Sequence, residues 1–212
     1  MHRVHNARSG DLFACRAVRT LSRIAILLSA ISSGFAQPSI CFVREHVTID
    51  LDSTKGCVSG KYLFRNLKSV ASQLPIFFPI PVTQECLAPE EVEVRFADEP
   101  LAFSLGPDGK SIRFRVPIEA VAEDTLEIRY CQPLGGHTFT YITTTIKGWG
   151  YPLDEAQFEI SCPREWQLDI SYPVERTEEK GDIKTYYFHQ TSFYPEEDLK
   201  IQWSEIQAKE EP

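Results

Sequence analysis

The sequence predicts an all-β protein, a single antiparallel β-sandwich of roughly ten strands after an N-terminal signal peptide. Three observations predict this class. Apolar and polar residues alternate with a period of two along most of the chain after residue 40. Turns rich in Gly, Pro, Asp and Asn interrupt the alternation at the spacing typical of sandwiches and barrels. No segment shows a convincing helical pattern.

The first 36 residues have the parts of a secretory signal peptide. An arginine-containing segment precedes the short apolar run IAILLSAI (24–31), and small residues lead to a predicted cleavage site after Ala36. The run is far shorter than the ~20 residues that a membrane-spanning helix needs. We therefore expect a periplasmic or secreted protein with one β-sandwich domain at 37–204 and a flexible acidic tail at 205–212.

The charge balance limits the classes of partner. Cleavage removes five of the 22 basic residues and one of the 30 acidic residues, which leaves a mature chain of 176 residues with a net charge of −12. Nucleic acids and anionic membrane surfaces require a basic footprint. We therefore expect neither as a partner, and we expect no membrane span after the leader is removed.

The first half of the domain contains a β-hairpin and several shorter strands. ICFVREHVTIDL alternates Val43, Val47 and Ile49 with polar residues, and the turn DSTKG leads into the next alternating segment. Proline brackets an apolar segment, LPIFFPIPV, which favours an edge strand or a bend. The turn GPDGK precedes SIRFRVPI and is the clearest hairpin signal in the chain. The predicted strands here are 40–51, 57–66, 74–82, 92–96, 101–105 and 111–118.

The second half continues the pattern up to a polar C-terminus. TLEIRYC follows an acidic turn, and two glycines at 135 and 136 interrupt the chain before the threonine-rich segment TFTYITTTIK. Threonine is β-branched and favours a strand. The predicted strands here are 125–131, 138–147, 153–160, 166–174, 183–193 and 198–203.

The segment after the threonines supplies the candidate binding residues. Trp149 lies between two glycines, and Tyr151 precedes a proline and the acidic pair Asp154 and Glu155. One interpretation is that the aromatic residues fold back over the end of the sandwich and cover the core. The other is a glycan or peptide platform, with the two acids accepting hydrogen bonds at its rim.

The same segment carries a resemblance. Tyr-Ile-Thr-Thr with a nearby Trp and Pro-Leu, followed later by YYFHQTSFYPEEDLKIQW, resembles an uncharacterised family of exported bacterial β-sandwich proteins. The resemblance covers most of the mature chain. It implies a sandwich-like domain and an envelope location, and it brings no catalytic residues and no known activity.

Five cysteines remain after cleavage, and none of them forms a CxxC motif. Disulfide bonds are the default in an oxidising compartment. Strand alternation places Cys41 and Cys162 on inward faces and Cys57 and Cys131 on polar faces. This suggests one bridge between Cys41 and Cys162, and a second between Cys131 and either Cys57 or Cys86. The alternative is that some of the cysteines are small buried apolar residues.

No sequence motif in the chain indicates a particular enzymatic reaction. Ser59 lies in a hairpin strand with the wrong spacing for a nucleophile elbow. His46, His137 and His189 are too far apart in sequence to form a metal motif, and no phosphate-binding loop or dinucleotide motif is present. We therefore expect no metal and no cofactor.

Two functions remain open, together with a third that shares the sequence features of the first, an accessory for the folding or assembly of a membrane complex in the cell envelope. The leading hypothesis is an exported, non-catalytic β-sandwich that binds a protein or glycan partner, through loops or through a sheet edge such as LPIFFPIP. The alternative is a carboxylate-dependent hydrolase of cell-envelope polymers. Its acids would come from Asp154 with Glu155, or from the group Glu196, Glu197 and Asp198.

Overall fold

The structure is a computed structural model that describes residues 39–205. It consists mainly of strands, and the only helical elements in this range are two 3₁₀ turns, η1 (Pro107–Gly109) and η2 (Thr144–Trp149). The predicted all-β class is confirmed. The predicted signal peptide (1–36) and residues 206–212 of the predicted tail lie outside the described residues. No helix within residues 39–205 has the length and hydropathy to cross a membrane.

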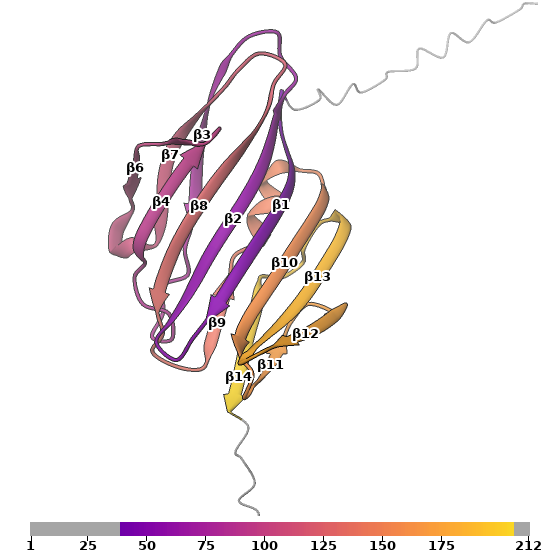
Figure 1. Cartoon of the computed structure of the whole chain (residues 1–212). Helices are drawn as coiled ribbons and strands as arrows, with labels where there is room; N and C mark the ends of the chain where they lie inside the picture. The colour runs from indigo at the N-terminus through magenta and orange to yellow at the C-terminus, as the bar shows by residue number, and fades with distance from the viewer. Residues whose placement is uncertain (1–38, 206–212) are drawn as a thin grey trace, which may run out of the picture. The chain divides into compact units, whose positions relative to one another are not determined.

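Eight strands form one large sheet, whose long central strands lie side by side in Figure 1. Every pair of neighbours is antiparallel except β1 and β10, which run parallel. A parallel pair needs a long crossover, and here it includes β9 and η2. The strands, in spatial order, are β12 (Arg176–Lys180), β13 (Ile183–Phe193), β10 (Leu153–Pro163), β1 (Ile40–Leu51), β2 (Lys55–Asn66), β8 (Glu123–Pro133), β4 (Glu90–Phe96) and β5 (Glu99–Pro100).

Two smaller antiparallel sheets of three strands each accompany the large sheet. We refer to them as the β3 sheet and the β9 sheet. The β3 sheet has the order β3 (Ser72–Pro79), β7 (Ser111–Ile118), β6 (Phe103–Leu105), and the β9 sheet has the order β11 (Trp166–Ile170), β14 (Leu199–Glu205), β9 (Thr138–Tyr141).

Both small sheets cover the same face of the large sheet. Tyr62 of β2 packs its ring against Phe78 of the β3 sheet, at 5.8 Å between centroids. Its hydroxyl oxygen lies 2.9 Å from that of Tyr141 in the β9 sheet. Since one side chain contacts both small sheets, the fold has two layers with the core between them.

Alternation along the central strands builds this core. On β1, Val47 and Ile49 are fully buried, while His46 and Thr48 face away from the core. An irregularity in the β1–β2 register between Phe42 and Arg44 shifts the alternation. Phe42 therefore faces the core, and Cys41 faces the opposite way.

A disulfide bond joins Cys57 and Cys131, which pair directly across β2 and β8. Their neighbours Val58 and Tyr130 are buried in the core, so the bridge lies on the outer face of the large sheet. It is one of the two pairings that the sequence left open for Cys131. Cys162 is a buried thiol, so the predicted bridge to Cys41 is not formed.

The threonine-rich segment differs from the predicted strand at 138–147. Strand β9 ends at Tyr141, and η2 begins at Thr144. Asp198 is the physical reason, because its Oδ1 atom accepts hydrogen bonds from the backbone N–H groups of Thr143 (3.1 Å) and Thr144 (3.0 Å). Gly150 ends η2 in the left-handed conformation, at φ 77°, which glycine adopts without strain.

Candidate functional site

A cavity of about 170 Å³ lies on the large sheet, between strand β3 and the segment from the end of β9 into η2. Strand β3 forms one wall, and the segment from Tyr141 to Trp149 forms the other. Strands β1, β2 and β8 supply the base. We call this cavity the Glu45 pocket. Its volume equals that of roughly five or six water molecules at ~30 Å³ each, so it has room for one small chemical group.

The pocket runs from the surface to the core. Thr145 and Phe77 line its outer part and are exposed to solvent. Glu45, Tyr62 and Tyr141 line its inner part, and each is less than 5% exposed. The lining of the pocket therefore extends from the solvent-exposed surface to the buried core.

Glu45 is the unusual residue of the pocket. Its side chain is 3% exposed, and its Oε1 atom has no hydrogen-bond partner. In the sheet it pairs with Tyr62 on one side and Ala156 on the other, and neither gives it a positive charge. Burial raises the pKa of the Glu45 carboxyl from 4.5 to about 8. The isolated protein therefore holds Glu45 mainly as a neutral acid at pH 7.

Two tyrosine hydroxyl groups lie near this acid. Tyr62 and Tyr141 form a buried hydrogen bond with each other. Gly60 allows this arrangement, because a Cβ atom at position 60 would lie 2.0 Å from the Tyr62 hydroxyl oxygen. Burial raises the pKa of both tyrosines well above 10, so both are neutral at physiological pH. The polar base of the pocket consequently contains one acid and no base.

Aromatic rings form much of the remaining wall. Phe42 and Phe64 stack with their ring centroids 5.1 Å apart. Trp149 packs on both, at 5.8 Å from Phe42 and 5.7 Å from Phe64. No Lys, Arg or His side chain is among the described residues that line the pocket. The pocket therefore combines aromatic surfaces with a single carboxyl group.

The structure separates the four residues predicted to bind a partner. Trp149 lines the Glu45 pocket. Tyr151 and Asp154 line a second cleft of about 270 Å³ together with Cys41 and Arg65, where the Tyr151 hydroxyl accepts a hydrogen bond from the backbone N–H of Phe42.

Glu155 lies on the outer face of the large sheet. One of its carboxylate oxygens is 3.0 Å from Nε2 of His189, and the other is 3.9 Å from Arg44. On the same face, His46 lies 3.0 Å from Glu159. The two adjacent acids Asp154 and Glu155 therefore do not share one cleft.

The remaining candidates have structural partners. Asp198 is bound to the start of η2, and Glu196 forms an ion pair with Lys147 at 3.0 Å. The ring of His137 lies 5.9 Å from that of Trp203. Within residues 39–205, no three His, Cys, Asp or Glu side chains are placed to hold a metal ion together.

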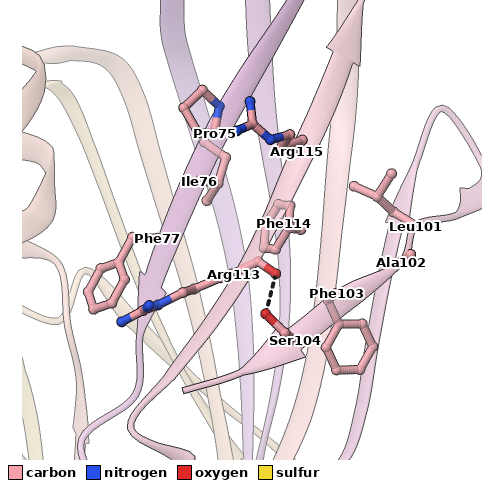
Figure 2. A pocket seen from close by; sticks show the side chains of 10 residues that line it. All are labelled: Pro75, Ile76, Phe77, Leu101, Ala102, Phe103, Ser104, Arg113, Phe114 and Arg115. Carbon is pink, nitrogen blue, oxygen red and sulfur yellow. Dashed lines mark hydrogen bonds between the residues drawn. The ribbon is translucent and has the colours of Figure 1, made fainter. Parts of the chain in front are cut away.

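A second feature is an open groove on the β3 sheet. Figure 2 shows Phe77, Phe103 and Leu101 around it, with Arg113 and Arg115 alongside. The guanidinium group of Arg113 lies 5.4 Å from the centre of the Phe77 ring. Neither arginine forms an ion pair with another of residues 39–205, although the chain as a whole is acidic. The groove is thus an apolar surface with two unneutralised positive charges.

Comparisons with known proteins find structures of similar fold, and they assign the chain to no family. No family model matches the chain, and no curated protein matches it. Among solved structures, a "putative nutrient binding protein" of Legionella pneumophila matches with a TM-score of 0.63 and 13% identity, over 79% of this chain and 67% of that one.

An M1 zinc metallopeptidase from Deinococcus radiodurans also matches, with a TM-score of 0.50 and 11% identity over 78% of this chain. A mutant of that enzyme with a bound Tyr-Ser-Ala substrate matches with a TM-score of 0.51. The chain spans 43% of the length of the metallopeptidase. At such identities, these matches show the all-β fold alone.

Sequence reasoning missed Glu45 although a signal was present. Position 45 has the same parity as Val43, Val47 and Ile49, so strand alternation assigns it to the core face. A charged residue on the apolar face of a strand is rare unless it has a partner or a function. The aromatic residues that line the pocket come from β1, β2, β3 and the Tyr141–Trp149 segment, and no local sequence pattern indicates that these four parts of the chain lie together.

Proposed function

We propose that this chain is an exported, non-catalytic binding domain whose ligand enters the Glu45 pocket. The observation that carries this proposal is the buried carboxyl group without a hydrogen-bond partner at the base of an aromatic cavity open to the surface. An unpaired buried polar group costs free energy, and one that lines a cavity can be completed by a ligand or a water that enters this cavity.

Two further observations support export and binding. The Cys57–Cys131 disulfide bond is compatible with an oxidising compartment such as the periplasm. The Legionella protein, which has a similar fold, is described as a "putative nutrient binding protein". That description belongs to the Legionella protein, and for this chain it supports only the general idea of a binding module.

The shape of the pocket favours a small group over an extended glycan. A glycan platform needs an exposed aromatic face, whereas Trp149 packs against Phe42 and Phe64. Trp149 stays in our proposal as a wall of the pocket, while Tyr151, Asp154 and Glu155 have no part in it. The ligand is a small molecule or a short terminal group of a larger one.

The hydrolase alternative gains no support. Glycoside hydrolysis needs two carboxyl groups on either side of one bond, about 5 to 10 Å apart. Asp154 and Glu155 face different surfaces, and Glu155 is already paired with His189.

A matched pair of variants tests the proposed function. Thr145→Trp places an indole at the mouth of the pocket, and Thr191→Trp makes the same change at an exposed position on β13, outside the pocket. The probes are 1-butanol, sodium butyrate and n-butylammonium chloride, followed by two-dimensional NMR. At least one probe should shift the amide resonances around Glu45 in the wild type and in Thr191→Trp, and not in Thr145→Trp. If no probe shifts them, or if Thr145→Trp responds like the wild type, the proposal is wrong.

The groove of Figure 2 favours a second function that is compatible with the first, the binding of a protein partner. Phe77 and Phe103 offer apolar contacts, Arg113 and Arg115 offer positive charge, and β6 is an edge strand. The partner that fits is an extended segment with alternating apolar and acidic residues.

Fluorescence anisotropy with synthetic peptides tests this second function. A peptide of alternating Phe and Glu should bind the wild type, and its analogue with Lys in place of Glu should not. The double variant Arg113→Glu/Arg115→Glu should reverse this preference. Equal binding of both peptides to the wild type would eliminate the groove as a charge-selective site.

A further inference from the structure

We propose that the ligand of the Glu45 pocket is an organic amine in its ammonium form, held by the Glu45 carboxylate and by the surrounding aromatic rings. This inference rests on the proposed function and names the chemical class of the ligand. It concerns a short amine, or an amine at the end of a longer molecule, whose hydrocarbon part contacts the aromatic walls.

The first argument concerns the unpaired acid in the lining of the pocket. Among residues 39–205, three other buried side-chain atoms have no hydrogen-bond partner, on Tyr130, Gln132 and Tyr186, but none of these residues lines the pocket. The Asn66 side-chain amide donates to the backbone oxygens of Val70 and Glu119, at 3.0 and 2.9 Å. The Thr143 hydroxyl contacts the Tyr172 hydroxyl at 2.6 Å and donates to a backbone oxygen. Glu45 is the only acid among the buried polar residues, and its Oε1 atom has no donor. The missing component is therefore a hydrogen-bond donor.

The second argument concerns the sign of charge. A carboxylate that loses its water requires a positive partner, and none of the residues that line the pocket supplies one. An ammonium group offers both the charge and the N–H donors. An anionic ligand would meet the carboxyl group and find no basic side chain, so we expect the pocket to reject it.

The third argument concerns the walls. Aromatic rings attract cations to their faces through the ring quadrupole, by about 0.5 to 2 kcal/mol per contact depending on desolvation. Phe42, Phe64 and Trp149 cluster within 6 Å of one another beside the carboxyl group. Short hydrocarbon chains also gain from leaving water at such a surface. The pocket therefore matches both ends of an alkylammonium ion.

A neutral ligand is the competing possibility. Protonated Glu45 can donate its own proton to a carbonyl or hydroxyl oxygen, so an alcohol would also fit the pocket. The two possibilities differ in what replacement of Glu45 by glutamine does. Glutamine keeps the size, the acceptor and a donor, but it cannot become negative. An ammonium ligand depends on the negative charge, and an alcohol does not.

The experiment compares n-butylammonium, 1-butanol and butyrate in NMR titrations of the full domain at pH 8. In the wild type, n-butylammonium should bind at least about tenfold more tightly than 1-butanol, and butyrate should not bind. In Glu45→Gln the two binding probes should differ by less than about threefold. The exposed change Glu119→Gln provides the control and should keep the wild-type preference.

The outcomes separate the inference from the proposed function. If 1-butanol binds as tightly as n-butylammonium, or if Glu45→Gln keeps the ammonium preference, the inference is wrong while the pocket remains a binding site. If none of the three probes binds, the proposed function fails as well. Because the preference is first measured in the wild type, the test does not depend on how well Glu45→Gln folds.

Discussion

The hydroxyl oxygens of Tyr62 and Tyr141 lie 2.9 Å apart and join the large sheet to the β9 sheet. Both side chains are fully buried, so each hydroxyl depends on the other for a hydrogen bond. Tyr141→Phe leaves the Tyr62 hydroxyl without this partner and should reduce the free energy of unfolding by about 1 to 3 kcal/mol. Urea unfolding at pH 7 measures the loss.

A double-mutant cycle gives the control. Tyr62→Phe/Tyr141→Phe removes both hydroxyl groups, so it should cost clearly less than the sum of the two single changes. If the losses of the single variants simply add, the two hydroxyl groups contribute independently.

Burial of Glu45 should make the stability of the domain fall as pH rises. The pKa of its carboxyl is raised from 4.5 to about 8, so the folded state keeps a proton that the unfolded state releases between these pH values. The free energy of unfolding should therefore fall through this window, by roughly 3 to 5 kcal/mol for this group. Below pH 4.5 both states hold the proton, and above pH 8 neither does.

Glu45→Gln tests this expectation. The variant has no carboxyl to ionise, so its stability advantage over the wild type should grow from pH 5 to pH 8. Contributions from other groups cancel in the difference, because both proteins contain them. Urea unfolding at several pH values provides the measurement, with Glu119→Gln as the exposed control. An advantage that is constant across this range would contradict the assignment of Glu45 as a buried, unpaired acid.

Local alternation was sufficient to predict most of the strands and the direction of several side chains. It placed Val47 and Ile49 in the core, and it placed Cys57 and Cys131 on the polar face where their disulfide bond lies. These features depend on a period of two within one strand, which a sequence displays directly.

Long-range contacts account for what could not be predicted. The threonine-rich segment has the composition of a strand, but Asp198, 55 residues after Thr143, binds its backbone and begins η2. The register shift after Phe42 turns Cys41 away from the core, and no residue in this part of the sequence predicts such a shift. The site combines residues from β1, β2, β3, β8 and the Tyr141–Trp149 segment, so its geometry appears only in the folded chain.

The Cys57–Cys131 bond should stabilise the domain by restricting the unfolded chain. It closes a loop with a sequence separation of 74, and native disulfides of this kind contribute about 2 to 4 kcal/mol. Cys57→Ser/Cys131→Ser should lose about this amount in urea unfolding. Reduction of the unfolded wild type before alkylation should add the mass of two further alkyl groups. An unchanged alkylated mass after reduction would show that the bond does not form.

Asp198 should control both stability and the shape of the pocket. Its Oδ1 atom accepts bonds from the backbone of Thr143 and Thr144 and from the Thr144 hydroxyl, at 3.1, 3.0 and 2.7 Å. Asp198→Ala removes these bonds and should cost about 1 to 2 kcal/mol, as the loss of a helix N-cap does. It should also speed hydrogen exchange at the amides of residues 143 and 144.

Asp198→Asn is the matched control, because its side-chain oxygen still accepts hydrogen bonds. It should cost less than Asp198→Ala and keep most of the amide protection. Equal losses for Asn and Ala would mean that these hydrogen bonds do not hold η2 in place.

The affinity for n-butylammonium should rise with pH, because binding requires Glu45 to lose its proton. The pKa of Glu45 is about 8 in the unliganded protein. The groups that face it, Tyr62, Tyr141 and Tyr172, have pKa values raised by burial and stay neutral throughout. The apparent affinity should therefore increase roughly 50-fold between pH 6 and pH 8. It should level off above pH 8, until the amine itself deprotonates near its ordinary pKa of about 10.4.

Calorimetry in two buffers with different ionisation enthalpies measures this linkage directly. At pH 6 nearly one proton should leave the protein for each ammonium ion bound, since free Glu45 is protonated and bound Glu45 is not. The released proton should disappear in Glu45→Gln and persist in Glu119→Gln. An affinity that is independent of pH over this range would mean that the cation binds without ionising Glu45. Because Glu45 is the only acid that lines the pocket, this result would contradict the inference.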